Sequence, residues 1–337
     1  MGKVYGIGNP LIDIIVEVDD EDLNSLGIYK GAMHLIDEKQ REKLLNFISP
    51  LNHLLFLGGS CPNTMITLAS LGVEVTLGGK VGSDKYGKIY HQRLKELNVN
   101  DQLVDSSHPT GSSIILITED SERTMNTYLG ANRLYNRDDV VVKSLKASDY
   151  LYFTGYMWDT ENQKEALKEA LKIAKTANIK VAFDIADPLV VSRNRDEFLH
   201  LIEDYIDIVF ANSEESRILF DNYDPYECCK SMGKLCETAI VKYGKHGSFI
   251  SHNQQMMKIP VHGPQSALDT TGAGDTYAAG FLFGLVNNLS VESSGEIASY
   301  LAGEIIQQQG AQFSKEKAQQ LLDYLRKTYQ LKRGRFW

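Results

Sequence analysis

The sequence predicts an α/β protein with a mostly parallel central sheet and helices on both faces. Short apolar runs rich in β-branched residues alternate with longer segments of helical period through most of the chain, which is typical of repeated strand-helix-strand units. The segment 161–177 places Ala166, Leu167 and Ala170 on one helical face, as a helix that covers a sheet requires. The 337 residues are enough for one large domain or two smaller ones.

The elements follow from these two patterns in chain order. Strands of the main sheet are expected where a short apolar run stands between polar or turn-forming residues, at 3–8, 54–57, 73–78, 150–153, 181–184, 208–211 and 239–242. Helices are expected where apolar residues recur every three or four positions, at 38–48, 62–71, 85–97, 161–177, 196–205, 213–220, 275–286, 292–308 and 315–329.

Two stretches interrupt this alternation. Residues 12–18 and 112–128 have the pattern of antiparallel strands that lie outside strand-helix-strand units. Because both stretches are small and far apart in sequence, we expect them to form one β-sheet lid on the main domain. The lid is placed near 12–35 and 102–132, and residues 1–337 are expected to form a single domain.

Composition narrows the class of protein further. The net charge of −9 argues against a broad surface for nucleic acid, although one loop can still bind a phosphate group. The four cysteines show no metal-binding or disulfide spacing, and the longest apolar runs are too short to span a membrane. With no signal-peptide pattern at its start, the chain is expected in the cytoplasm, without nucleic-acid or membrane partners.

The strongest chemical signal is Asp-Thr-Thr-Gly-Ala-Gly-Asp at residues 269–275, directly before an apolar helix. Small residues at a helix start let backbone N–H groups converge on an anion, and we expect the amides of Gly272, Ala273 and Gly274 to do so. Asp275 would repel a phosphate, but it is placed to accept the proton of a hydroxyl group that attacks one. The alternative is an ordinary helix start with an acidic first turn.

These residues resemble the C-terminal signature of the ribokinase-like (PfkB) family of carbohydrate and nucleoside kinases. Gly-Gly-Ser-Cys-Pro-Asn at 58–63 is similar to the family's substrate-binding diglycine and Asn. Gly-Asn-Pro-Leu-Ile-Asp-Ile at 8–14 and the segment 122–131 resemble the adenosine kinase branch. The matches run in family order from residue 6 to about 312. The resemblance implies a ribokinase-like three-layer α/β/α sandwich with a small β-sheet lid, and ATP and Mg²⁺ as reactant and cofactor.

The resemblance also implies which residues bind the phosphate acceptor. Asp13 interrupts an apolar strand, and because an unpaired buried carboxylate costs several kcal/mol, it needs a partner. The matching Asp of the family accepts hydrogen bonds from two sugar hydroxyls; the alternative is an exposed Asp on a lid strand. Arg123 either closes over the transferring phosphate or is a solvated hairpin side chain. The full substrate-binding set is Asn9, Asp13, Gly59, Ser60, Asn63 and Arg123.

The donor side is implied in the same way. Asn212 and Glu215 resemble an Asn-x-x-Glu element whose Glu organises Mg²⁺-bound water, although an ordinary helix cap would have the same residues. Lys242, Gly244 and Gly247 resemble the nucleotide loop, with Lys242 in place of the commoner Thr; the alternative is a tight hairpin turn. A monovalent cation such as K⁺ is implied near three further residues, Asp269, Thr271 and Gly310.

The function expected from this resemblance is ATP-dependent phosphorylation of the 5′-hydroxymethyl group of a ribose-containing substrate, adenosine to AMP. A ribokinase- or fructokinase-like sugar kinase with the same mechanism is the alternative within enzymes. A non-catalytic nucleoside sensor on the same fold is the alternative outside them. Relatives exist as monomers or as homodimers joined by the lid, and the sequence leaves both states open.

Overall fold

The structure, a computed structural model, describes residues 2–120, 122–264 and 266–331. Within these residues a nine-stranded sheet forms the centre of the molecule. Neighbouring strands are parallel except at one edge, where β12, β13 and β14 are antiparallel. The strand order is β14 (Gln255–Ile259), β13 (Ser248–His252), β12 (Thr238–Lys242), β11 (Ile208–Asn212), β10 (Lys180–Asp184), β9 (Tyr150–Thr154), β1 (Lys3–Ile7), β5 (Glu74–Gly82) and β6 (Asn100–Ser106).

Helices cover both faces of this sheet, because successive strand residues point to opposite sides. Val4 of β1 is buried in one hydrophobic core and Tyr5 in the other. The first core is closed by α3 (Ser60–Ser70), α4 (Lys85–Glu96), α10 (Ala273–Val286), α11 (Val291–Ile305) and α12 (Lys315–Tyr329). The second is closed by α5 (Val142–Lys146), α6 (Glu161–Ala177), α7 (Pro188–Tyr205), α8 (Ser213–Phe220) and α9 (Pro225–Met232). The predicted three-layer sandwich is confirmed.

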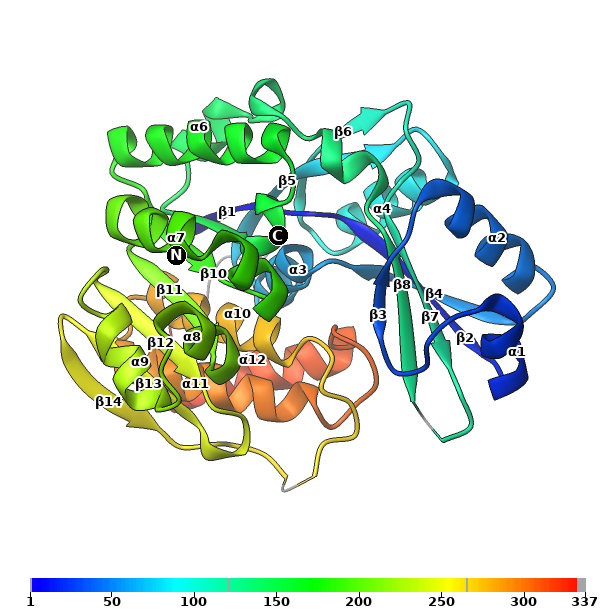
Figure 1. The fold of residues 1–337 in the computed structure, drawn as a ribbon. Coiled ribbons are helices and arrows are strands. Elements are labelled where there is room, and N and C mark those ends of the chain that lie inside the picture. Colours follow the sequence, from blue (N-terminus) through cyan, green and yellow to red (C-terminus); the bar gives the residue numbers. More distant parts are fainter. Residues whose placement is uncertain (1, 121, 265, 332–337) are drawn as a thin grey trace.

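A second, smaller sheet stands at one side of this body (Figure 1). Its strand order is β3 (Met33–Leu35), β8 (Arg123–Tyr128), β7 (Ser112–Ile117), β2 (Leu11–Glu17) and β4 (His53–Gly58). One face is buried under α1 (Asp20–Leu26) and α2 (Glu38–Ile48) through Ile12, Ile14 and Leu44. Asp13, on the opposite face, borders a large cavity. We call this sheet with its two helices the lid.

The structure corrects three details of the sequence interpretation. The run at 54–57 was expected in the main sheet, but β4 pairs antiparallel with β2 in the lid, because a short apolar run does not specify its partner strand. The expected lid range 102–132 also includes most of β6, which pairs with β5 in the main sheet. Helix α7 has a kink at Asn194, and the segment after the kink corresponds to the expected helix at 196–205; the segment before it, which begins at Pro188 after the Asp187 cap, was not expected. None of the described helices is long and apolar enough to cross a membrane.

Candidate active site

A cavity of about 1710 Å³ lies where the carboxyl ends of the main-sheet strands face the lid. Asn9 follows β1, while Asp184, Asn212 and Lys242 are the last residues of β10, β11 and β12. Because these strands are parallel, their carboxyl ends meet at one edge, and all four side chains line the cavity. Ligands of open parallel sheets bind outside this edge.

The glycine loop forms the start of α10, as the sequence predicts. Gly272 is the residue before the helix, with φ of 74°, and an added Cβ would lie 2.5 Å from the Ala311 Cβ, so this position requires glycine. No side chain caps the helix, which leaves the N–H groups of its first turn available to an anion. The Ala273 N–H donates to the Thr270 carbonyl instead. The residues from Thr270 to Asp275 line the cavity.

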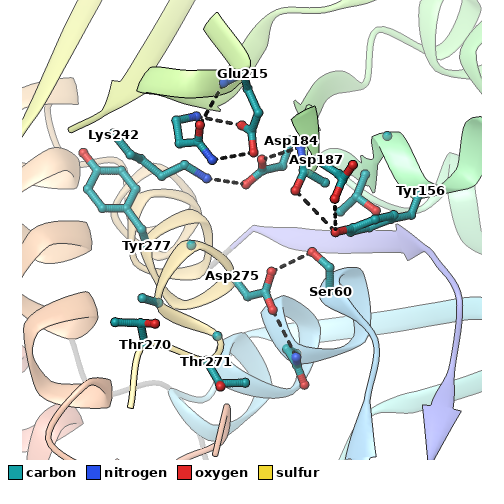
Figure 2. A pocket seen from close by; sticks show the side chains of 18 of the residues that line it. Ser60, Tyr156, Asp184, Asp187, Glu215, Lys242, Thr270, Thr271, Asp275 and Tyr277 are labelled. Atoms are coloured by element: carbon teal, nitrogen blue, oxygen red, sulfur yellow. Dashed lines mark hydrogen bonds and ion pairs between the residues drawn. The ribbon is translucent and has the colours of Figure 1, made fainter. Parts of the chain in front are cut away.

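Asp275 lies in the first turn of α10 with both carboxylate oxygens held (Figure 2). The Ser60 hydroxyl donates to Oδ1 at 2.6 Å, and the Asn63 amide donates to Oδ2 at 3.0 Å. Burial raises the pKa of Asp275 to about 6, although these two hydrogen bonds lower it in part. Ser60 and Asn63, predicted to bind substrate, therefore also orient Asp275.

Lys242 extends into the cavity from the end of β12. Its Nζ lies 2.8 Å from Asp184 Oδ2, and the two side chains are only 16% and 4% exposed. A Cβ added to Gly274 would lie 3.3 Å from the same Nζ, so the ammonium group is next to the glycine loop. Burial by itself lowers the pKa of Lys242, but Asp184 and Glu215 raise it above its usual value. A fixed positive charge therefore stands beside the predicted phosphate site.

Asn212 and Glu215 form a closed pair at the start of α8. The Asn212 amide and backbone N–H donate to the two Glu215 oxygens at 2.6 and 2.7 Å, and Asn212 Oδ1 accepts from the Glu215 N–H. This is the helix cap that was the sequence-based alternative, but Glu215 also lines the cavity. Burial raises the pKa of Glu215 to about 7, and the charge of Lys242 lowers it in part.

The expected nucleotide loop joins β12 to β13. Gly244 and Gly247 both have positive φ, of 51° and 87°, and both line the cavity. The strands on either side are antiparallel, so the tight hairpin turn is also present.

The lid contributes Asp13, whose carboxylate faces the cavity. Among the described residues it makes no hydrogen bond or ion pair that compensates its charge. Burial raises the pKa of Asp13 to about 7, and the nearby Arg123 charge lowers it in part. An uncompensated carboxylate that faces a cavity is suited to accept hydrogen bonds from ligand hydroxyls.

Arg123 of β8 reaches from the lid to the loop before α10. Its Nη1 donates to Asp269 Oδ1 at 2.7 Å and to the Thr271 hydroxyl. Gly310 N–H donates to Asp269 Oδ2 at 2.9 Å, so the three residues expected at a K⁺ site do cluster. Burial would raise the pKa of Asp269, but hydrogen bonds from Thr271 and Gly310 hold it below its usual value.

Two residues predicted to bind substrate have partners within the chain. The Asn9 amide donates to the Tyr156 carbonyl at 3.1 Å, and its Oδ1 accepts from Gln163 at 2.8 Å. Gly59, with φ of 101°, approaches the Asn9 carbonyl so closely that a Cβ would lie 2.1 Å from that oxygen. Both residues still line the cavity, so they shape its wall.

Within the part of the chain that the structure describes, no side-chain cluster indicates a directly bound metal ion. The described residues contain no group of three or more His, Cys, Asp or Glu suited to hold one. Asp184 and Glu215 nevertheless present carboxylates to one cavity. Mg²⁺ usually keeps several waters and binds one or two carboxylates together with substrate phosphates, so these residues fit a hydrated Mg²⁺ that arrives with a nucleotide.

Sequence reasoning missed Asp184 and its neighbour Asp187. Asp187 caps α7 with Oδ1, and its Oδ2 lies 3.4 Å from the Tyr156 hydroxyl inside the cavity (Figure 2). The signal was available, because a strand ending in Asp at the carboxyl edge of a parallel sheet places that carboxylate at the ligand site.

A glycine loop at a helix start, a held Asp beside it and a lid over an α/β/α sandwich define a phosphotransferase that acts on an alcohol group. The chain belongs to the pfkB family of carbohydrate kinases, whose sequence model matches residues 53–318. The sequence-based family assignment is thereby confirmed, and the protein is a sugar or nucleoside kinase. Membership of this kinase family implies the use of ATP and Mg²⁺.

Individual relatives include both kinds of kinase. The crystal structure of adenosine kinase from Sinorhizobium meliloti is similar at 36% identity, over 97% of this chain and 99% of that chain, with a TM-score of 0.85. A probable sugar kinase from Rhizobium etli is similar at 33% identity, over 97% and 98% of the two chains, with a TM-score of 0.86. The ribokinase of Haemophilus influenzae is 27% identical over 88% of this chain and 95% of its own length.

Proposed function

We propose that this kinase transfers the terminal phosphoryl group of ATP to the 5′-hydroxyl of adenosine, giving AMP and ADP. The observation that carries the proposal is an apolar wall on the lid beside Asp13. Asp13, Ser113, Thr127 and Leu35 are paired in one row across β2, β7, β8 and β3, so their side chains share the face that borders the cavity. The Asp13 carboxylate, which can accept hydrogen bonds from sugar hydroxyls, therefore lies on the same face of the lid as the apolar side chain of Leu35.

The apolar side chains of this wall are Leu11, Met33, Leu35, Met125 and Leu129. Leu35 and Met33 are 58% and 44% exposed, which is costly for the protein unless a ligand covers them. A flat purine ring would bury these surfaces, whereas a free sugar, with hydroxyls around its ring, would bury them poorly. This difference favours a nucleoside over a sugar.

The proposed mechanism uses the residues around the glycine loop. Asp275 accepts the proton of the 5′-hydroxyl as its oxygen attacks the terminal phosphorus, and the bond from phosphorus to the bridging oxygen of ADP breaks. The N–H groups at the start of α10, from Gly272 and Gly274, and the Lys242 ammonium stabilise the charge on the transferred group. Asn212, Gly244 and Gly247 border the space proposed for the rest of the nucleotide.

Mg²⁺ bound to ATP would supply further neutralisation of phosphate charge, held through water by Glu215 and Asp184. The charges of these two carboxylates raise the pKa of Lys242. Two carboxylates beside the single ammonium group of Lys242 leave a net negative charge, which suits a divalent cation. Closure of the lid over the acceptor would exclude water from the reaction.

A panel of adenosine, inosine, ribose and fructose with ATP, scored by ADP release, tests the proposal. Adenosine should give the highest kcat/KM, and Asp275→Asn should lower the rate of release by about a thousandfold with every acceptor. Equal or higher kcat/KM with ribose or fructose would identify a sugar kinase. The similarity to the probable sugar kinase of Rhizobium etli favours this alternative. No turnover together with a nucleoside-induced rise in Tm would identify a sensor.

The oligomeric state is either a monomer or a homodimer joined by the lid. Leu54 and Phe56 on the edge strand β4 are 62% and 45% exposed, and a lid-mediated homodimer would cover them. Sedimentation velocity of the purified protein distinguishes the two states.

A further inference from the structure

The contact between Arg123 and Asp269 joins two segments that are 146 positions apart in sequence. Arg123 begins β8 of the lid, whereas Asp269 precedes the glycine loop of the main body. The side chains are 27% and 10% exposed, so the ion pair is largely shielded from solvent. Arg123 and Asp13 belong to the same lid sheet, and the charge of Arg123 lowers the pKa of Asp13 in part. The lid therefore delivers a positive charge to the edge of the phosphate site.

Four donors contact the Asp269 carboxylate in this arrangement. Its Oδ1 accepts from the Thr271 N–H at 2.9 Å, from the Thr271 hydroxyl at 2.6 Å and from Arg123, while its Oδ2 accepts from the Gly310 N–H at 2.9 Å. Each carboxylate oxygen offers about two lone-pair positions, so three donors crowd Oδ1, whereas Oδ2 accepts a single hydrogen bond. A monovalent metal ion bound through Oδ1 would compete with the guanidinium group for that oxygen.

We propose that Arg123 is the resident cation of the Asp269 carboxylate, so that lid closure supplies the positive charge that a bound K⁺ would otherwise supply beside the glycine loop. The kinetic part of this inference rests on the proposed phosphoryl transfer, whereas the cation-binding part does not. Arg123 acts in this scheme as a positioning residue, because it contacts the loop through Asp269 and Thr271 rather than the reacting atoms.

One consequence concerns the timing of the reaction. When the lid opens, Asp269 loses its guanidinium partner and the loop gains uncompensated negative charge next to an anion-binding site. Phosphate binding is then weaker in the open form than in the closed form. The ion pair would thereby couple lid closure to phosphate binding, and phosphoryl transfer to water would be disfavoured while the acceptor site is open.

The kinetic test compares KCl with tetramethylammonium chloride at equal ionic strength. Wild-type protein should turn over at the same rate in both salts. Arg123→Met should lose about tenfold in rate in tetramethylammonium chloride and regain rate in KCl, because the vacated carboxylate can bind K⁺. Strong activation of the wild type by K⁺, or an Arg123→Met variant that does not respond to K⁺, would overturn the proposal.

Two further variants control for other causes. Asp269→Asn removes the carboxylate, so its rate should be low in both salts with no response to K⁺. Lys30→Met removes another lid cation, which pairs with Asp20 and Asp120 inside the lid and not with the loop. This variant should behave as the wild type does; a K⁺ response like that of Arg123→Met would show a general effect of lid charge and contradict the assignment to Arg123.

Thermal unfolding in the same two salts provides a readout that does not need turnover. A cation that binds only the folded protein raises Tm. K⁺ should raise the Tm of Arg123→Met relative to tetramethylammonium but leave the wild type and Asp269→Asn unchanged. A K⁺-specific rise in the wild type would overturn the inference. If no acceptor is phosphorylated, the proposed function is wrong. The Tm values of the wild type and the two variants still show whether K⁺ binds at Asp269 only when Arg123 is absent.

Discussion

Replacing Asp13 by Asn should stabilise the folded protein while weakening acceptor binding. The Asp13 carboxylate has no hydrogen-bonding partner among the described residues, and burial raises its pKa from 3.8 to about 7. The folded protein therefore holds this proton more tightly than the unfolded chain does. Below pH 3.8 both states are protonated and no penalty exists; the penalty grows as pH rises and is complete above about pH 7.

The size of the penalty follows from this difference in pKa. At about 1.4 kcal/mol per pKa unit, ionised Asp13 destabilises the folded protein by up to about 4 kcal/mol above pH 7. With an unfolding entropy of about 2.1 cal/mol/K per residue, a chain of 337 residues should gain about 6 °C in Tm from Asp13→Asn. The gain should be largest near pH 8 and clearly smaller near pH 5.

Differential scanning fluorimetry of both proteins from pH 5 to pH 8 measures this gain. Glu17→Gln is the matched control, because Glu17 is an exposed carboxylate on the same strand, β2, and its removal should leave Tm unchanged. The acceptor KM of Asp13→Asn should rise by about 100-fold, since hydrogen bonds to the charged oxygens are lost. A Tm gain that does not depend on pH, or a lower Tm at pH 8, would refute the reasoning.

Three further predictions concern the phosphate site. Asp275→Asn should lower kcat by about a thousandfold with little change in acceptor KM, and near-normal kcat would exclude Asp275 as the base. In the wild type, kcat at saturating acceptor should fall as pH drops below about 6, where Asp275 becomes protonated; a flat kcat profile down to pH 5 would contradict this role. Lys242→Met should lower Tm and raise the ATP KM, because it leaves the Asp184 carboxylate buried without its ammonium partner. Adding Asp184→Asn to that variant should restore Tm but not the ATP KM, whereas independent effects on Tm would argue against a coupled pair.

Local sequence patterns account for most of the helices and main-sheet strands. Helix α6 occupies 161–177 as predicted, because its apolar period and its Thr160 cap are encoded within the segment. The start of α10 is equally local, since the small residues and Asp275 that define it are consecutive. Strands β13 and β14 were not among the expected strands, although a hairpin turn after β12 was offered as an alternative, because both strands are only five residues long and mix polar with apolar side chains.

The site could be predicted in part for the same reason. Its glycine loop and Asp275 are adjacent in sequence, so the sequence predicts an anion site and a base at one place. The ion pair of Lys242 with Asp184 depends instead on the order of parallel strands, because β11 lies between β10 and β12 in the sheet. A Lys at the position of the commoner Thr could be noted from the sequence, but its carboxylate partner could not.

The sequence by itself therefore determined the layered α/β architecture, the family and the glycine-rich helix start with Asp275 in its first turn, to which we assign the proposed anion site and base. The tertiary structure decided which sheet β4 joins and where the lid places its charges. The physical reason is that periodicity and capping act over a few residues, whereas strand partners and ion pairs depend on register across the whole chain. Arg123 is the clearest case: a side chain that the sequence left as either a phosphate contact or a solvated residue is joined to Asp269 by the way the lid packs on the main body.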